Sequence, residues 1–165
     1  MVAQDIFLKV QGAKSGKING EADDTDHKDE IEVLGWSWGM TAPTDIATAQ
    51  ASGRYQMRML NITKGVDKAS TPLMSVLTSN ETITKALLTV RKAGKTGKPI
   101  EYLKVTLEQA RIVSYQVHTG VNNPAVLIEE LSFAFQKITV DYTPQGPDGQ
   151  PRPGTSFTTD WSTAS

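Results

Sequence analysis

The sequence predicts a mainly β protein, folded as a tight two-sheet β-barrel with one short α-helix at its side. Three observations support this fold class. Apolar residues recur at every second position through most of the chain, which is the period of a strand with two different faces. β-branched and aromatic residues, which strands prefer, are frequent in these runs. Several runs also change phase midway, as strands do where they bend around a small barrel.

The predicted strands follow one another from the N-terminus to residue 142. A glycine at a phase change is typical of a β-bulge or a sharp bend, and Gly35 holds that position. The alternating apolar residues are, in order, Ile6, Leu8 and Val10; Ile31 and Val33; Leu34, Trp36, Trp38 and Met40; Tyr55, Met57 and Met59; Leu60 and Ile62; Ala86, Leu88 and Val90; Leu103, Val105 and Leu107; Ile112, Tyr115 and Val117; Leu131, Phe133 and Phe135; and Ile138, Val140 and Tyr142.

One segment, residues 70–80, has the pattern of a helix instead. Thr71 is its expected N-cap, and Pro72 takes the first helical position, where a missing N–H costs nothing. Leu73, Val76 and Leu77 fall on one helical face. We therefore expect one short helix against the barrel.

Two connections depart from both periods. Residues 41–53 are mostly small and polar and read as a long loop, which in a compact domain is usually functional or disordered. After Tyr142 the chain is rich in Pro and Gly, so it does not read as a central strand. The sequence therefore predicts a β-barrel domain over residues 1–145 and a tail over 146–165, with Phe157 and Trp161 as the residues that would dock its far end.

The composition limits the classes of function. The 165 residues suit one domain, and 17 basic against 18 acidic residues give a formal net charge of −1. Such a balance predicts no nucleic-acid partner and no binding to an anionic membrane. The absence of cysteine excludes disulfides, thiolate zinc sites and cysteine nucleophiles. No stretch approaches the roughly 18 apolar residues of a membrane helix, so membrane insertion is not expected either.

The first residues, MVAQDIFLKVQGAKSGK, do not resemble a cleavable signal peptide. Their apolar run is short and is interrupted by Gln4, Asp5 and Lys9. We expect synthesis in the cytoplasm, and any export would need a dedicated machine.

The stretch GWSWG, residues 35–39, matches the G-x-S-x-G motif that places a serine nucleophile in α/β hydrolases. That motif needs a sharp turn at the serine followed by a helix, whereas small residues without helical pattern follow here. In a strand, Trp36 and Trp38 point to one face and Ser37 to the other. Strand alternation is therefore the favoured interpretation, and a serine hydrolase using Ser37 is the weaker alternative.

Other candidate chemistry is also weak. Residues 21–30, EADDTDHKDE, lack the central glycine of an EF-hand loop, and residues 91–99, RKAGKTGKP, have proline where a phosphate loop needs Ser or Thr. These stretches read as a solvated loop and a basic hairpin turn. His27 and His118 both stand in polar stretches, and we expect them to be exposed. The residues alone predict no catalysis, no metal and no cofactor, but a one-domain binding or assembly protein.

Several stretches in order resemble the Hcp family, the haemolysin-coregulated proteins of bacterial type VI secretion systems. Together they cover most of residues 6–145. They are IFLKV at the start, DEIEVLGWSWGM with its W-S-W, KGVDKASTPLM before the helix, LTVRKAGKTGKPIEYLKVTLEQARI across the central hairpin, and LSFAFQKITVDYTPQ in the last long strand.

The resemblance implies both assembly and function. Six copies would form a ring with a wide pore, and rings would stack into a tube that is expelled with a spike at its tip. The tube would carry or chaperone effectors in its lumen and would itself be secreted. The implied partners are further copies of the chain and the sheath, spike and effector proteins of the secretion system. The resemblance implies no enzymatic activity and no metal.

An assembly of this kind needs a segment that reaches from one ring to the next, because a head-to-tail contact that never closes builds a filament. We predict that the loop stacks rings and that Trp36 and Trp38 anchor its base. As lumen candidates we take Ser114, Gln116 and His118, on the polar face of one strand. The predicted stacking loop consists of Thr41, Ala42, Pro43, Thr44, Asp45, Ile46, Ala47, Thr48, Ala49, Gln50, Ala51, Ser52 and Gly53.

The main alternative is a monomeric barrel that binds a small ligand inside. The many large apolar residues favour a filled interior over a cavity. The mass of the particle in solution separates this alternative from a ring.

Overall fold

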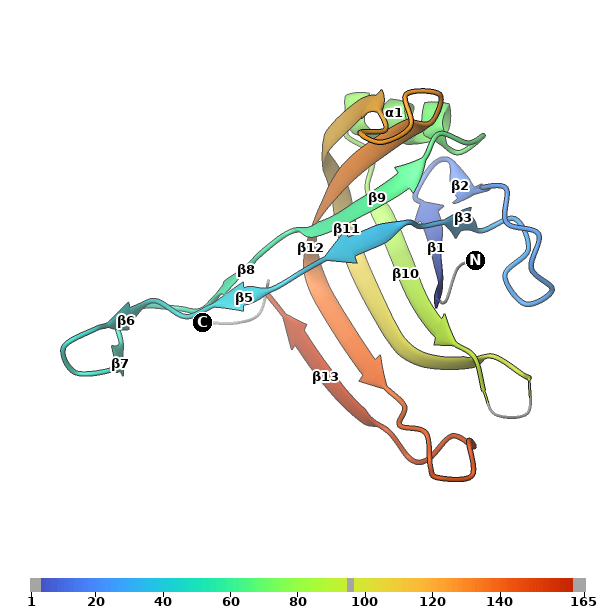
Figure 1. Ribbon diagram of the computed structural model, residues 1–165. Coiled ribbons are helices and arrows are strands. Elements are labelled where there is room, and N and C mark those ends of the chain that lie inside the picture. The colour runs from blue at the N-terminus through green and yellow to red at the C-terminus, as the bar shows by residue number, and fades with distance from the viewer. Residues whose placement is uncertain (1–3, 95–96, 162–165) are drawn as a thin grey trace.

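The computed structural model describes residues 4–94 and 97–161, which form one curled sheet, a projecting arm and a helix (Figure 1). The sheet and its extensions are almost entirely antiparallel β structure. The elements are β1 (Gln4–Gly12), β2 (Gly16–Ile18), β3 (Ile31–Glu32), β4 (Gly35–Ser37), β5 (Met40–Thr41), β6 (Thr44–Asp45), β7 (Gln50–Ala51), β8 (Gln56–Met57), β9 (Leu60–Gly65), α1 (Ser70–Thr78), β10 (Ile83–Lys92), β11 (Ile100–Thr119), β12 (Leu127–Tyr142) and β13 (Thr155–Asp160).

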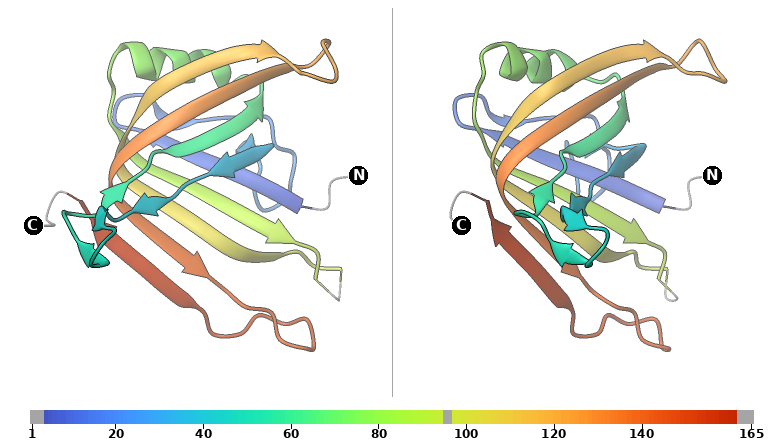
Figure 2. Two further views of the ribbon diagram at one scale, coloured as in Figure 1. Left: turned by 60° about the vertical axis from the view of Figure 1, so that its left-hand side comes forward. Right: turned by 90° about the vertical axis from the view of Figure 1, so that its left-hand side faces the viewer.

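Nine strands form the main sheet, in the order β2-β1-β10-β11-β12-β9-β4, with β3 on β1 and β13 on β12. Its two ends approach each other at the segment from β3 to β4. There the N–H of Val33 donates to the carbonyl of Ile6 (3.0 Å), and the N–H of Leu34 donates to the carbonyl of Thr63 (2.8 Å). The chain thus leaves one edge and joins the other, and no continuous ladder closes the sheet within the described residues. The prediction of a closed two-sheet barrel is wrong: the structure has one strongly curled sheet (Figure 2).

The core lies inside this curl and follows the predicted alternation. Leu8 and Val10 of β1 face Leu88 of β10 and Leu107 of β11, and all four are fully buried. Each buried side chain of this size stabilises the fold by about 1.5–3 kcal/mol. The prediction of strands from period-two apolar residues is confirmed for this part of the chain.

The long strands β11 and β12 bend where the sequence changes phase. Gln109 has a positive φ of 52°, and the buried positions switch there from Leu107 to Ala110. On β12 the same switch runs from Phe133 to Ile138. The phase change predicted for β12 is therefore a real switch of the buried face, and β11 switches its buried face beside it.

Helix α1 is confirmed, but it begins earlier than predicted. Its N-cap is Ala69, which makes no side-chain capping bond, so Thr71 is not the N-cap and Pro72 is not the first helical residue. The start is fixed instead by a turn: the N–H of Asp67 donates to the Ser70 hydroxyl (2.9 Å), and the Asp67 carboxylate accepts from the N–H of Ala69 (3.0 Å). Within the described residues, no helix has the length and hydropathy needed to cross a bilayer.

Beside α1, five polar side chains form what we call the buried ion-pair cluster: Lys64, Asp67, Ser70, Tyr115 and Glu129. The Lys64 ammonium contacts both the Asp67 carboxylate (2.9 Å) and the fully buried Glu129 carboxylate. Glu129 also accepts hydrogen bonds from the hydroxyls of Ser70 (2.7 Å) and Tyr115. The cluster joins β9, α1, β11 and β12 at one end of the curl.

Burial raises the pKa of the Tyr115 hydroxyl, and its bond to Glu129 adds to that rise. For Glu129, burial acts to raise the pKa of the carboxyl, but donors from Lys64, Tyr115 and Ser70 outweigh it and hold the pKa below its ordinary value of 4.5. The folded protein therefore keeps Glu129 charged.

The chain after Gln145 returns to the sheet. After a turn it forms β13, which pairs with the end of β12, from Lys137↔Asp160 to Tyr142↔Thr155. Phe157 lies opposite Val140 in this register and stays 42% exposed. The far end of the segment therefore forms an edge strand of the same sheet.

Candidate functional site

Residues 40–57 form a two-stranded ribbon, the arm, that projects far from the curled sheet (Figure 1). At its base β5 pairs with β8, and further out β6 pairs with β7. A long loop was expected over residues 41–53, and strands β6 and β7 within that range correct the expectation. Each strand is two residues long. Met57 of β8 packs against the core at the base of the arm, whereas the outer strands β6 and β7 are exposed, so their sequence carries no apolar alternation.

The tip of the arm is fixed by its own hydrogen bonds. The carbonyl of Asp45 accepts from the N–H of Ala49 (2.7 Å), and the Asp45 carboxylate accepts from the N–H of Ala47 (3.0 Å). Ala49 has a positive φ of 59°, which closes the turn. This turn presents Ile46 to solvent, with 98% of the residue exposed.

The base of the arm follows directly from β4, where Trp36 and Trp38 pack against the core. Ser37 lies on the opposite, exposed face and accepts a 3.3 Å hydrogen bond from the Asn61 amide. Strand alternation in GWSWG is thus confirmed, and the nucleophile elbow is excluded because strand β5, and no helix, follows.

The C-terminal strand holds the other side of the arm base. The Arg54 guanidinium lies 3.7 Å from the centre of the Trp161 ring and donates to the Trp161 carbonyl (2.8 Å). Tyr55 packs edge-on against the same ring, with 4.8 Å between centroids, and its hydroxyl meets that of Thr159 (2.7 Å). The backbone of Trp161 is also fixed, because its N–H donates to the backbone carbonyl of Gln136. We call these contacts the tail clamp.

The predicted lumen candidates lie together on the outer face of β11. Ser114 and Gln116 are exposed, and His118 is half-buried. The register places further residues from three neighbouring strands on the same face. This polar face contains Gly35 and Ser37 of β4; Asn61, Thr63 and Gly65 of β9; Ile128, Glu130 and Ser132 of β12; and Ser114, Gln116 and His118 of β11.

One row of this face is connected by hydrogen bonds across strands. The Ser132 hydroxyl donates to the side-chain Oδ1 of Asn61 (2.7 Å), and the side-chain Nδ2 of Asn61 donates to the Ser37 hydroxyl (3.3 Å). Ser114 lies directly opposite Ser132 and completes the row. The predicted lumen candidates do not include Ser37, Asn61 and Ser132, although each of these stands between apolar residues that face the core.

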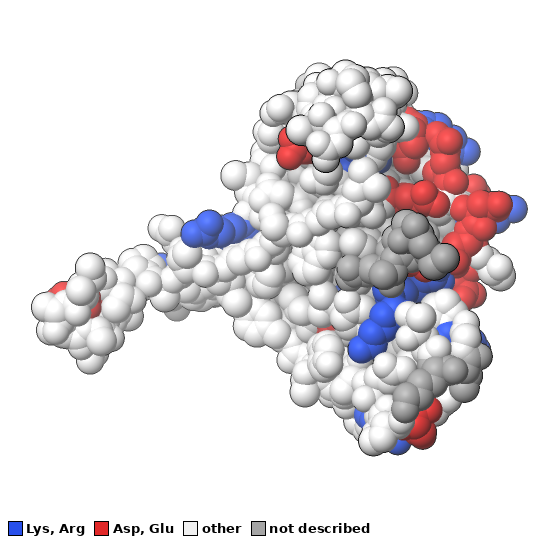
Figure 3. Space-filling view, in the orientation of Figure 1, with Lys and Arg blue, Asp and Glu red and all other residues white. Residues whose placement is uncertain are grey.

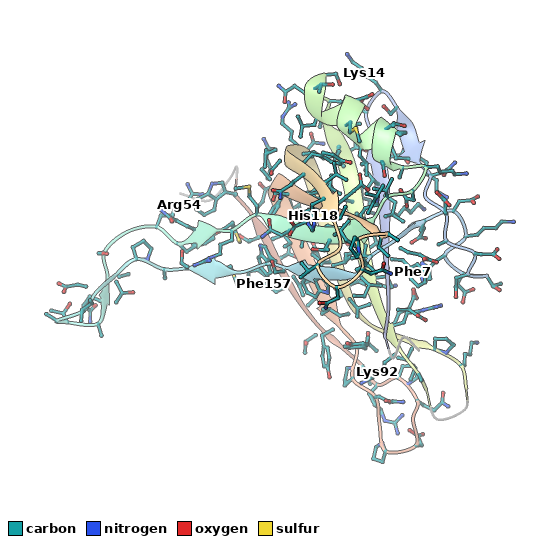
Figure 4. The ribbon with its side chains drawn as sticks, turned by 45° about the horizontal axis from the view of Figure 1, so that its top comes forward. Phe7, Lys14, Arg54, Lys92, His118 and Phe157 are labelled. Atoms are coloured by element: carbon teal, nitrogen blue, oxygen red, sulfur yellow. The ribbon has the colours of Figure 1, made fainter. Side chains whose placement is uncertain are left out.

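His118 ends the polar face near the β11–β12 turn, and Figure 4 labels it in the middle of the molecule. Its Nδ1 lies 2.9 Å from the carbonyl of Thr119 and its Nε2 3.1 Å from the Glu130 carboxylate. The Thr119 carbonyl, and after it Glu130, raise the pKa of the imidazole. The face therefore carries a cationic group more readily than a free histidine would.

His27 is buried, with 6% exposed, which corrects the expectation that both histidines are exposed. Its ring stacks on Phe7 with 4.6 Å between centroids. Nδ1 and Nε2 each lie 3.0 Å from a carboxylate, that of Glu30 and that of Glu101. Phe7 and Glu101 lie far from His27 in the sequence, so no local pattern reveals that this polar residue enters the interior.

The acidic stretch around His27 is used for contacts within the chain. The Asp24 carboxylate takes two hydrogen bonds from Arg91 (3.0 and 2.7 Å), which hold the pKa of Asp24 below its ordinary value. Residues 4–94 and 97–161 contain no group of three or more histidines and carboxylates arranged to hold a metal ion.

The strands on either side of the predicted basic turn, β10 and β11, pair antiparallel. This pairing confirms the hairpin predicted for residues 91–99. Residues 95 and 96 lie outside the described part of the chain.

Comparisons with known proteins agree with this geometry. The family model described as "Type VI secretion system effector, Hcp" matches residues 7–142. "Protein hcp1" of Pseudomonas aeruginosa is 34% identical over 150 residues, covering 90% of this chain and 88% of that protein. The "Major exported protein" of the same organism is 27% identical and covers 90% of this chain and 94% of that one.

A solved structure titled "Structure of a type six secretion system protein" superposes with a TM-score of 0.85 at 24% identity, covering 98% of both chains. At that identity the superposition bears on the fold alone. The family model and the first relative rest on sequence and span most of the chain. The chain belongs to the Hcp family of type VI secretion system proteins.

Proposed function

We propose that this chain is the inner-tube subunit of a type VI secretion system. Six copies form a ring, rings stack into a tube, the lumen holds small effectors, and the tube itself is secreted. Family membership supports this role in general, and two surfaces of this chain support its parts: the arm and the polar face. Both are regular, exposed structures that leave polar groups or side chains free for partners.

The arm is the observation that carries the proposal. A monomer gains little from a ribbon whose outer part is exposed, whereas an assembly needs an element that reaches a neighbour. Its small side chains let the ribbon lie flat against another surface. The tip adds Ile46, an apolar side chain that is 98% exposed and suited to burial in a contact.

The polar face supports the lumen assignment. It is a broad sheet surface in which serine, asparagine, threonine and glutamine predominate, with two glycines, Ile128, His118 and the acidic residue Glu130 among them. Such a surface offers donors and acceptors to many protein cargoes without a dominant charge or a large apolar patch. In this proposal Ser37, Asn61, Ser114 and Ser132 all face the lumen.

The first test is the particle itself. Size-exclusion chromatography with light scattering measures its mass, and negative-stain microscopy shows its shape. A mass about six times that of the chain, with a central hole, supports the ring. A monomer mass contradicts it.

The second test removes residues 47–52, the outer part of the arm. The expected result is intact rings that no longer stack, because the deletion lies outside the core. Tubes that form unchanged would overturn the stacking role of the arm.

The third test places a bulky residue on the polar face. Ser114→Trp is expected to lower capture of a tagged effector of the cognate system by about tenfold, because it occupies space next to Ser132. Lys85→Trp, on an exposed position of β10 outside this face, is the matched control. Equal capture by the two variants would contradict the lumen assignment.

The alternative of a monomeric barrel with an internal ligand has less support. The interior of the curl is filled by a continuous cluster of buried side chains, including Leu8, Ile62 and Phe133. A ligand there would have to displace the core.

A further inference from the structure

The base of the arm exposes an unusual set of side chains. We call Met40, Tyr55, Arg58, Met59 and Phe157 the arm-base surface. Met40 and Met59 are each 48% exposed and Phe157 is 42% exposed, so three large apolar side chains remain accessible at the base of the arm. A hollow of about 400 Å³ lies between Met40, Tyr55 and Phe157, and a second of similar size lies beside Met59 and Trp161. Methionine-lined hollows adapt readily to an incoming partner.

This surface is also basic. Residues 40–59 contain Arg54 and Arg58 against one acid, Asp45, which lies out at the tip. Arg54 stacks on Trp161, so its position is fixed while the residue stays exposed. Arg58 is exposed and makes no ion pair with any described residue. Figure 4 labels Arg54 at the root of the arm, and Figure 3 shows the blue of Lys and Arg there, with red only at the far tip of the projection.

The opposite side of the molecule carries the opposite charge. Residues 19–32, the acidic loop, contain seven acidic residues against Lys28 and His27. Asp23, Asp26 and Glu32 are exposed, and none of them forms an ion pair with a described residue. Figures 1 and 3 place this loop and its red carboxylates across the curl from the arm.

The acidic loop is held rigidly in spite of its charge. Two of its carboxylates are held inside the chain: Asp24 pairs with the Arg91 guanidinium (2.7 Å), and Glu30 contacts the His27 imidazole (3.0 Å). These contacts, with a hydrogen bond from the Lys68 N–H to Glu21 (2.6 Å), fix the loop on the body, while Asp23, Asp26 and Glu32 remain exposed. A fixed array of charges loses less entropy on docking than a mobile one.

We propose that the arm-base surface of one copy docks on the acidic loop of a copy in the next ring. This inference rests on the proposed function. It adds the surface that receives the arm-base surface, and the electrostatic attraction that orients one ring on the next. Opposite charges attract across this contact, whereas two arm-base surfaces would repel each other, and so would two acidic loops. The contact joins different surfaces, so it repeats without closing and gives the tube one polarity.

Zero-length cross-linking tests the contact directly. The Arg58→Lys variant keeps the charge and supplies an amine that carbodiimide joins to a carboxylate in direct contact. Unlabelled and ¹⁵N-labelled rings of the Arg58→Lys variant are mixed, cross-linked and analysed by mass spectrometry. The expected product joins position 58 of one copy to a peptide from residues 19–32 of another. The Arg58→Gln variant, which lacks the amine, is the matched control.

Charge reversal measures the force. Arg58→Glu is expected to reduce stacked rings about tenfold at equal concentration and to leave the ring mass unchanged. Rings with Asp23→Lys and Asp26→Lys should fail to stack with one another but stack with the Arg58→Glu rings. Raising the salt from 0.05 M to 0.5 M should weaken stacking of the unaltered protein, because salt screens exposed charges.

Each outcome has one meaning. If no rings form at all, the proposed function has failed before the contact is tested. If rings form but position 58 never links to residues 19–32, or charge reversal leaves stacking unchanged, the docking inference is overturned. A link from position 58 to a protein other than this chain in the intact system would assign the surface to that partner and also overturn it.

Discussion

The buried ion-pair cluster and the arm are both rich in polar groups, but they place those groups in opposite situations. In the cluster, Lys64 and Glu129 are fully buried and contact each other and three further side chains. In the arm the backbone is paired by two short ladders, while the side chains extend into solvent. A charge without a partner is costly only where water is excluded.

This difference separates stability from assembly within one chain. Changes in the cluster should alter the free energy of unfolding, because its partners are lost on unfolding. Changes in the arm should leave that free energy nearly unchanged and act on contacts between copies. The predictions below test this separation, from the largest expected effect on unfolding to the smallest.

The largest effect is expected for Glu129→Ala. It leaves the Lys64 ammonium buried next to a single carboxylate, that of Asp67, and two hydroxyls without their acceptor. Removing one partner of a buried ion pair costs about 3–5 kcal/mol. Urea unfolding followed by circular dichroism measures this loss. Glu130→Ala, one position along on the exposed face, is the matched control and should change little; equal losses in both variants would contradict the cluster's role.

A smaller effect is expected from pH. The pKa of Glu129 is lowered in the folded state from an ordinary value of 4.5, so its contribution is present above about that pH and is lost as the pH falls below it. The free energy of unfolding should therefore fall between pH 5 and pH 3. Glu129→Gln should flatten this dependence, and an unchanged slope in that variant would show that other carboxyls, such as Asp24, cause it.

The tail clamp lies between the two extremes. Trp161→Ala removes one cation–π contact and one edge-on ring contact, each of about 0.5–1.5 kcal/mol, so the loss should be about 1–2 kcal/mol. The freed Arg54 should also be cut faster by trypsin, because its guanidinium no longer stacks on a ring. Phe157→Ala, on the same strand but outside the clamp, should not change the cutting rate at Arg54.

The sequence predicted the parts of the fold that face the core. Val10, Val105 and Leu107 alternate with polar residues because one side of each strand excludes water, and the predicted phase change in β12 follows from a real switch of its buried face. Helix α1 was also predictable, because its apolar residues fall on one helical face. Its first residue was not, because the start depends on hydrogen bonds of Asp67 and Ser70 that the capping residues in the sequence do not reveal.

The parts that failed depend on contacts between distant residues. The outer part of the arm has no buried face, so no period marks β6 and β7, and His27 is buried beside Glu101, 74 positions away. The barrel was expected to close, but the chain changes partner at Val33 and Leu34, which pattern alone does not show. The polar face was only partly found, because Ser114, Ser132 and Ser37 come together through register and not through spacing.

The smallest effect on unfolding is expected for Ile46→Ser at the tip of the arm. With 98% of Ile46 exposed, no buried contact is lost, and the free energy of unfolding should change by less than about 0.5 kcal/mol. The turn should persist, because the backbone bonds of Asp45 to Ala47 and Ala49 do not involve this side chain. Stacking of rings should nevertheless weaken about tenfold, measured by light scattering, since one fully buried aliphatic side chain contributes about 1.5–3 kcal/mol to a contact. Val121→Ser, at a position 93% exposed in the β11–β12 turn, is the control for loss of an exposed apolar side chain. If both variants stack like the unaltered protein, the tip does not contact the next ring, and the arm acts through its base alone.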